Sequence, residues 1–192
     1  MSSTRLVERV PLALTALRAA LAPVVVALAL AWPEPGAFGA CLVVAFLSDV
    51  FDGIVARRLG VATPGLRRLD SLADSVFYVA ALFAAWHLHP AAIRAQAWPL
   101  ALLALLEATR YAVDLRKFGK EASYHMWSSK LWGVALFAGC FALLVFGEAR
   151  GFVPAAIWVG VAADLEGLAI SFVLRRWRTD VPTLWHAWRS RA

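Results

Sequence analysis

The chain has 192 residues, of which 61% are hydrophobic and 17% are charged, and its formal net charge is +6 at neutral pH. A mean hydropathy of +0.68, together with long apolar runs, excludes an ordinary water-soluble core and predicts an all-α integral membrane protein. The positive charge does not indicate nucleic acid binding, because the lysines and arginines cluster at the ends of the apolar segments.

Six apolar segments come close to the roughly 20 residues that a helix needs to cross a bilayer. They are residues 12–32, 36–58, 70–87, 98–115, 127–146 and 153–174. Stretches that contain proline and glycine separate the first three segments from one another. The last residues carry Trp185 and Trp188 beside arginines, which predicts an amphipathic segment on the membrane surface. We therefore expect a six-helix domain, 1–178, and a cytoplasmic tail, 179–192.

The basic residues predict the orientation of these segments. Cytoplasmic loops of membrane proteins carry an excess of lysine and arginine. One side of the predicted bundle carries only Arg94 and Arg150. The other side carries Arg5, Arg9, Arg57, Arg58, Arg67, Arg68, Arg116, Lys117, Lys120, Arg175, Arg176, Arg178, Arg189 and Arg191. Both termini are therefore expected on the cytoplasmic side, in a bacterial cytoplasmic membrane.

Four carboxylates lie inside the second and third apolar segments, where acids are costly. An aspartate at the centre of a spanning helix costs roughly 2.5–3.5 kcal/mol, so such a residue indicates a functional site. Asp49 and Asp52 are spaced to share one helix face, and Asp70 and Asp74 are spaced to share another. Carboxylate oxygens bind hard cations such as Mg2+ or Mn2+, which in turn hold phosphate groups. The pattern predicts metal-dependent phosphoryl chemistry at the cytoplasmic side.

Three residues beside the first pair suit a ligand that contains phosphate. Gly53 shares the face of the aspartates and lets a ligand approach the helix backbone closely. Ala56 has a small side chain, which leaves room for a ligand on that face of the helix. Arg57 supplies a fixed positive charge suited to phosphate. These side chains do not by themselves identify the substrate.

The combined pattern resembles the signature of the CDP-alcohol phosphotransferase family. The residues that carry the resemblance are Asp49-x2-Asp52-Gly53-x2-Ala56-Arg57 followed by Asp70-x3-Asp74. Members of that family are membrane enzymes that move a phosphatidyl or similar group from a CDP-linked donor to an alcohol and release CMP. Six helices and this length are also typical of them. The resemblance therefore implies a CDP-alcohol phosphatidyltransferase of phospholipid biosynthesis, similar to phosphatidylglycerophosphate synthases or phosphatidylinositol phosphate synthases.

Two positions depart from the family pattern. The family has a second glycine where this chain has Leu66, and Gly65 lies one position earlier. Either Gly65 substitutes through a shifted loop, or the loop closes over the nucleotide differently. In the first segment, Leu12 replaces the usual asparagine, which leaves Thr15 as the expected nucleotide contact. Arg18 either contacts the nucleotide as well or extends to the membrane interface.

The resemblance implies a role for each motif residue. Two divalent ions, Mg2+ or Mn2+, are expected. One ion is bound by Asp49, Asp52 and Asp70, and the other by Asp49, Asp70 and Asp74. Asp74 is also the expected catalytic base, which activates the acceptor hydroxyl. The CDP part of the donor is expected to contact Thr15, Asp49, Gly53, Ala56, Arg57, Thr63 and Gly65.

Family members hold the acceptor with basic residues from the later helices, which implies Arg110, Arg116 and Lys130 here. Glu107 is spaced to orient Arg110. Compact relatives often make phosphatidylglycerophosphate, so glycerol 3-phosphate is the first expected acceptor. The basic group leaves inositol 1-phosphate as the alternative, ahead of an uncharged alcohol. Relatives are commonly dimers, so we expect a homodimer.

Two rival functions remain. A divalent-cation channel or carrier lined by the four aspartates belongs to a different class of protein. It is disfavoured because the acids cluster at one membrane side and because the glycine, alanine and arginine of the motif would serve no purpose in it. An inactive or altered-donor relative is the other rival, motivated by Leu66.

Overall fold

The computed structural model describes residues 10–60 and 63–190, and these residues are largely helical. The helices are α2 (Val10–Ala31), α3 (Pro35–Leu59), α4 (Pro64–Leu88), α5 (Pro90–Ala95), α6 (Ala97–Phe118), α7 (Trp127–Phe146), α8 (Phe152–Val173) and α9 (Leu184–Arg189). No strand occurs in the described ranges, where Ser123 and Thr179 form an isolated parallel bridge. The all-helical prediction is therefore confirmed.

The third predicted segment starts earlier than expected, because its helix has a cap that lies outside the apolar run. Thr63 has extended backbone dihedrals, and its Oγ1 accepts a hydrogen bond from Leu66 N at 3.2 Å. A threonine at this position followed by a proline is a favourable helix start. Helix α4 therefore begins at Pro64, and Asp70 and Asp74 lie inside it instead of at its beginning.

Within residues 10–60 and 63–190, five helices are long and apolar enough to cross a membrane, namely α2, α3, α4, α7 and α8, as expected for an integral membrane protein. The fourth predicted segment is a helix of similar length, α6, with 22 residues. It is not among the five. The physical reason is its charge, because Glu107, Arg110 and Asp114 all lie within it.

The described residues fall into two units, each of which is described by itself. Unit 1 comprises Met1–Pro90 and Leu143–Glu148, and unit 2 comprises Ala91–Ala142 and Ala149–Ala192. Helices α2, α3 and α4 belong to unit 1, whereas α5, α6, α8 and α9 belong to unit 2.

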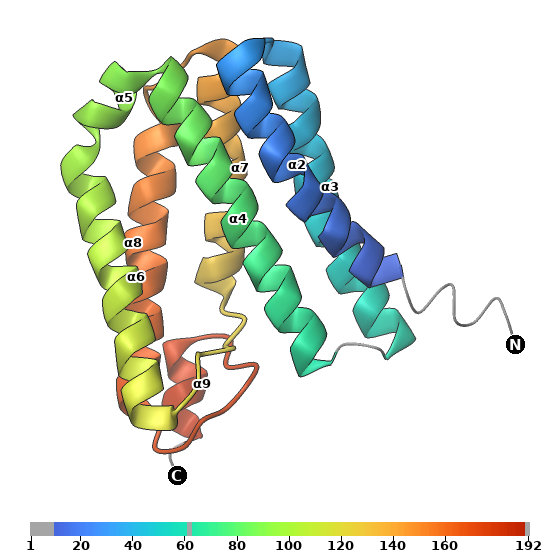
Figure 1. Cartoon of the computed structure of the whole chain (residues 1–192). Helices are drawn as coiled ribbons and strands as arrows, with labels where there is room; N and C mark the ends of the chain where they lie inside the picture. Colours follow the sequence, from blue (N-terminus) through green and yellow to red (C-terminus); the bar gives the residue numbers. More distant parts are fainter. Residues whose placement is uncertain (1–9, 61–62, 191–192) are drawn as a thin grey trace, which may run out of the picture. The chain divides into compact units, whose positions relative to one another are not determined.

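In unit 1, helix α2 lies along both α3 and α4 (Figure 1). Its buried residues recur every three or four positions, which places them on one stripe of the helix. They are Pro11, Thr15, Arg18, Ala22, Val25 and Ala29. Arg18 is the charged member of a stripe that is otherwise apolar or weakly polar. Because a buried charge is costly without partners, this guanidinium requires carboxylates inside the unit.

In unit 2, helix α8 packs against α6 and against the short helix α9 (Figure 1). The last segment joins this unit through backbone pairing, in which Asp180 N donates to Ser123 O at 3.1 Å. A buried apolar cluster lies beneath it, formed by Tyr124, Met126, Ile170, Leu174, Val181 and Ala187. Residues 179–190 are thus part of unit 2, while Trp185 and Trp188 stay exposed, as an interfacial segment requires.

Close packing in unit 2 makes one glycine sensitive to substitution. A Cβ added at Gly160 would lie 2.5 Å from Trp132 Nε1 and 3.0 Å from Leu103 Cδ1. We expect Gly160→Ala to destabilise the protein by roughly 1–3 kcal/mol, because overpacking displaces a rigid indole. Thermal unfolding in detergent, read as a lower Tm, measures this effect.

Gly133→Ala on α7 is the matched control. A Cβ at Gly133 would meet nothing within 4 Å. Because alanine favours a helix by about 0.8–1.0 kcal/mol over glycine, its Tm should equal or exceed that of the wild type. Equal unfolding temperatures for the two variants would contradict the packing described here.

Candidate active site

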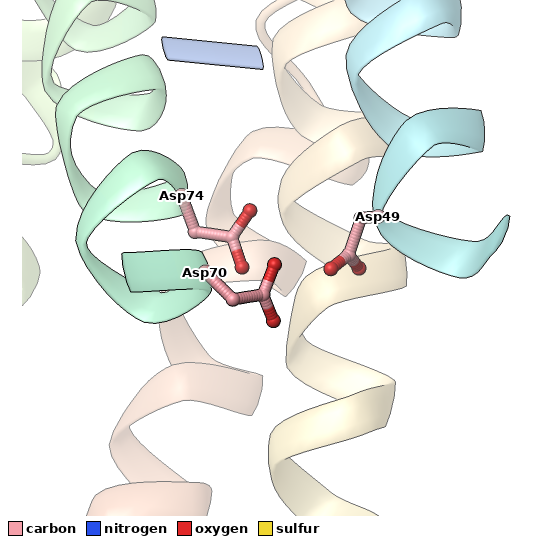
Figure 2. Close-up of side chains that lie close together, drawn as sticks. All are labelled: Asp49, Asp70 and Asp74. Atoms are coloured by element: carbon pink, nitrogen blue, oxygen red, sulfur yellow. The ribbon is translucent and has the colours of Figure 1, made fainter. Parts of the chain in front are cut away.

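The four aspartates lie on two helices of unit 1, Asp49 and Asp52 on α3 and Asp70 and Asp74 on α4. The carboxylates of Asp49, Asp70 and Asp74 each offer one oxygen, and these oxygens all lie within 4.8 Å of one another. Figure 2 shows Asp70 and Asp74 extending from α4 towards Asp49 on α3. Asp52 is not in this group, and it is buried.

Arg18 is the partner that all four aspartates share. Its Nη1 lies 3.2 Å from Asp49 Oδ1 and also contacts Asp74 Oδ1. Its Nη2 lies 3.1 Å from Asp70 Oδ1 and also contacts Asp52 Oδ2. The side chain is 1% exposed, so the alternative in which Arg18 extends to the membrane interface is wrong. Four carboxylates offer a guanidinium more favourable partners than the interface does.

Within the described ranges, one carboxylate oxygen of the cluster has no hydrogen bond and is free to bind a metal. Asp70 Oδ1 is buried and lies near Arg18 Nη2 without the alignment of a hydrogen bond, so it has no hydrogen-bond partner among the described residues. Leaving such an oxygen unsatisfied is costly. A donor set made only of carboxylate oxygens fits a hard cation such as Mg2+ or Mn2+, whereas zinc sites favour nitrogen and sulfur. The residues present therefore fit a divalent metal.

Comparison with known proteins identifies the family of the chain. A family model described as CDP-alcohol phosphatidyltransferase matches residues 8–176. The chain belongs to the CDP-alcohol phosphatidyltransferase family. Members of this family are membrane transferases of substituted phosphate groups in phospholipid biosynthesis, and they generally use a divalent metal. Comparison with curated proteins and with solved structures gave no match.

Three residues expected at the CDP donor of this phosphatidyltransferase lie within helices of unit 1. Thr15 is buried on α2, and its hydroxyl donates to Pro11 O at 3.0 Å. This bond leaves the hydroxyl oxygen able to accept a further hydrogen bond. On α3, Ala56 is buried and Gly53 is half-buried. Gly53 and Ala56 follow Asp49 and Asp52 at helical spacing, so they continue the face that carries the two acids.

The other donor residues lie at the α3–α4 connection. Thr63 caps α4 through Leu66 N, so its hydroxyl has a structural role. Gly65 and Leu66 lie in the first turn of α4 and not in the preceding loop. A Cβ at Gly65 would meet nothing within 4 Å, so its surroundings are open. Arg57 is on α3, but its side chain lies outside the described part of the structure.

The expected acceptor residues belong to unit 2, where Arg110 has two carboxylate partners. Arg110 Nη2 lies 2.7 Å from Glu107 Oε1, which confirms the expected pairing of these residues. Arg110 Nε lies 3.1 Å from Asp164 Oδ1 on α8. Asp164 is 2% exposed, and its Oδ2 has no hydrogen-bond partner among the described residues. The charge of Arg110 is therefore balanced within unit 2.

Arg116 and Lys130 are exposed, unlike Arg110. Lys130 Nζ lies 4.6 Å from the centroid of the Trp127 ring, a favourable cation–π distance. Glu166 on α8 accepts hydrogen bonds from Ser128 Oγ at 2.6 Å and from Leu184 N at 3.1 Å. Glu166 therefore links α8 by hydrogen bonds to the first turn of α7 and to the first residue of α9.

Sequence reasoning missed a buried polar network in unit 2. Ser171 Oγ donates to Asp114 Oδ1 at 2.6 Å and lies 3.0 Å from the Tyr124 hydroxyl. Burial raises the pKa of Tyr124 to about 12, so its hydroxyl stays protonated at neutral pH and can donate. Lys117 Nζ donates to Ser171 O at 2.8 Å. The signal in the sequence was Asp114 itself, an acid inside the predicted apolar segment 98–115.

Proposed function

We propose that this protein transfers the phosphatidyl group of CDP-diacylglycerol to an alcohol, depends on a divalent metal, and releases CMP. The observation that carries the proposal is the three-carboxylate group of Asp49, Asp70 and Asp74 in a chain of this family. Two ions of Mg2+ or Mn2+ would supply Lewis-acid stabilisation of the donor diphosphate.

The four aspartates are proposed as metal ligands, and one of them is also proposed as the catalytic base. Asp49, Asp52 and Asp70 hold one ion, and Asp49, Asp70 and Asp74 hold the other. Asp74 accepts the proton of the acceptor hydroxyl. The hydroxyl oxygen forms a bond to the phosphorus of the phosphatidyl group while the bond from that phosphorus to CMP breaks, and CMP leaves with the electron pair. The CDP part contacts Thr15, Asp49, Gly53, Ala56, Arg57, Thr63 and Gly65.

For the acceptor we propose glycerol 3-phosphate, with inositol 1-phosphate as the alternative. Arg110, Arg116 and Lys130 bind its phosphate. Because Glu107 and Asp164 already balance the charge of Arg110, more of the attraction for phosphate comes from the exposed Arg116 and Lys130.

A panel of alcohols and alcohol phosphates, incubated with CDP-diacylglycerol and Mg2+ or Mn2+, tests this proposal through CMP release. Glycerol 3-phosphate should give the fastest release. Lys130→Gln should raise the KM for that acceptor about ten- to a hundred-fold, because a hydrogen bond to a charged group contributes about 1.5–3 kcal/mol.

Lys120→Gln is the matched control for Lys130→Gln. Lys120 Nζ lies 3.8 Å from the Trp177 ring, so it also stacks on a tryptophan, and no acceptor role is assigned to it. Its KM should stay at the wild-type value. Absence of CMP release with every acceptor contradicts the proposed reaction, whereas fastest release with inositol 1-phosphate contradicts only the first choice of acceptor.

We further propose that α6 is a sixth membrane span, that both termini lie in the cytoplasm, and that the active site faces the cytoplasm of a bacterial cell. The uneven distribution of lysine and arginine supports this orientation. Inside unit 2, Arg110 pairs with Glu107 and Asp164, and Asp114 accepts a hydrogen bond from Ser171. These contacts lower the cost of placing the charges of α6 in a bilayer. We also propose that residues 1–178 form the catalytic domain and that residues 179–192 form its tail. The protein is proposed to be a homodimer.

A further inference from the structure

Arg18 contacts the four motif aspartates, and no role has yet been given to it. It comes from the buried stripe of α2, and its guanidinium reaches carboxylates on both α3 and α4. Nη1 lies between Asp49 and Asp74, and Nη2 lies between Asp52 and Asp70. Each terminal nitrogen of the guanidinium therefore contacts one pair of carboxylates, with one member of the pair on α3 and the other on α4.

The four carboxylates repel one another strongly unless a cation lies among them. Charge repulsion at these separations grows as the surroundings lose water. It is therefore strongest at Asp52, whose side chain is 5% exposed, whereas those of Asp49, Asp70 and Asp74 are 45%, 32% and 34% exposed. Arg18, with 1% of its side chain exposed, supplies a positive charge that does not depend on dissolved metal. An arginine suits this position because it stays protonated and presents several donors in a fixed plane.

The same carboxylates that contact Arg18 form the group suited to a metal. Asp49, Asp70 and Asp74 belong to both sets. The oxygen Asp70 Oδ1, which has no hydrogen bond, is also the atom that Nη2 approaches. A divalent ion and the guanidinium therefore draw on the same carboxylates, and each binds more weakly in the presence of the other.

We propose that Arg18 is a positioning residue that acts as the resident counter-ion of this site: it holds the four aspartates together without metal and gives up part of its contacts when a divalent ion binds. The proposal rests on the proposed function, because that function assigns the metal to these aspartates. It goes beyond that function by giving the metal site a built-in competitor, which sets how much free metal is needed to fill it.

Mn2+ binding and thermal unfolding of Arg18→Gln, measured without CDP-linked substrate, test the proposal. Metal-free Arg18→Gln should unfold at a lower temperature than the metal-free wild type, because the carboxylates lose their cation. It should bind Mn2+ roughly ten-fold more tightly, within the range usual for coupled sites. Its rise in Tm on adding Mn2+ should therefore exceed that of the wild type. Arg18→Lys, which keeps the charge, should lie between the two.

The outcomes separate this proposal from the proposed function. If the wild type binds neither Mn2+ nor Mg2+, the metal-dependent function fails, and this proposal fails with it. If the wild type binds metal but Arg18→Gln binds it equally or more weakly, only the role of Arg18 is overturned. Should Arg18→Gln unfold on purification, it is prepared in Mg2+ and then treated with chelator. Unfolding only after chelation supports the proposal, and failure to fold even in Mg2+ overturns it.

Discussion

Replacing Asp74 by asparagine is expected to slow CMP release about 10²–10⁴-fold, which is the usual contribution of a general base. Asparagine keeps the size of the side chain but accepts no proton. The variant also lacks a proposed ligand of the ion bound by Asp49, Asp70 and Asp74. The loss in kcat should therefore persist when Mn2+ is raised far above the concentration that saturates the wild type. CMP release from CDP-diacylglycerol at saturating acceptor measures the effect.

Asp180→Asn is the matched control for Asp74→Asn, since it makes the same chemical change outside the aspartate cluster. Asp180 is exposed and pairs with His125 Nδ1 at 3.0 Å. Its φ of 56° lies in the left-handed region, which asparagine tolerates well. Activity should be unchanged in this variant. Undiminished CMP release by a folded Asp74→Asn protein would remove Asp74 from the role of base.

Asp70→Asn is expected to abolish binding of both proposed ions, because Asp70 belongs to both ligand sets. Activity should fall to the level seen with chelator. Asp52→Asn should remove one ion and leave the other, since Asp52 belongs to a single set. The number of Mn2+ ions bound per chain, from equilibrium dialysis or electron paramagnetic resonance, measures the difference between the two variants.

Thermal unfolding of each variant in detergent shows whether it is folded before its ions are counted. A folded Asp70→Asn protein that binds as many ions as the wild type contradicts the assignment of Asp70 to both sets. Loss of both ions in Asp52→Asn contradicts the division into two sets with different members.

The aspartate site could be recognised from the sequence because its information is local. Asp49 and Asp52, and Asp70 and Asp74, are each within one helical turn, so the period of the helix brings each pair to one face without any tertiary contact. The helices were predictable for the same reason, since a continuous apolar run of sufficient length is itself the signal. The start of α4 was missed because Thr63, which caps it, lies outside the apolar run.

The partners of the buried arginines could not be predicted, because they depend on contacts between distant segments. Arg18 and Asp74 lie far apart in the chain, as do Arg110 and Asp164. A sequence indicates that an arginine in an apolar helix needs a partner, but several acids are available to it.

The sequence by itself thus determined the helical class, the family and the two pairs of acids, since each depends on residues that lie close together in the chain. Tertiary structure decided that Arg18 lies among four carboxylates instead of at the interface, and that Asp164 balances Arg110. The physical reason is common to both arginines. Which charges meet in a low-dielectric interior depends on the angle and register at which helices pack, and those emerge only when the whole chain folds.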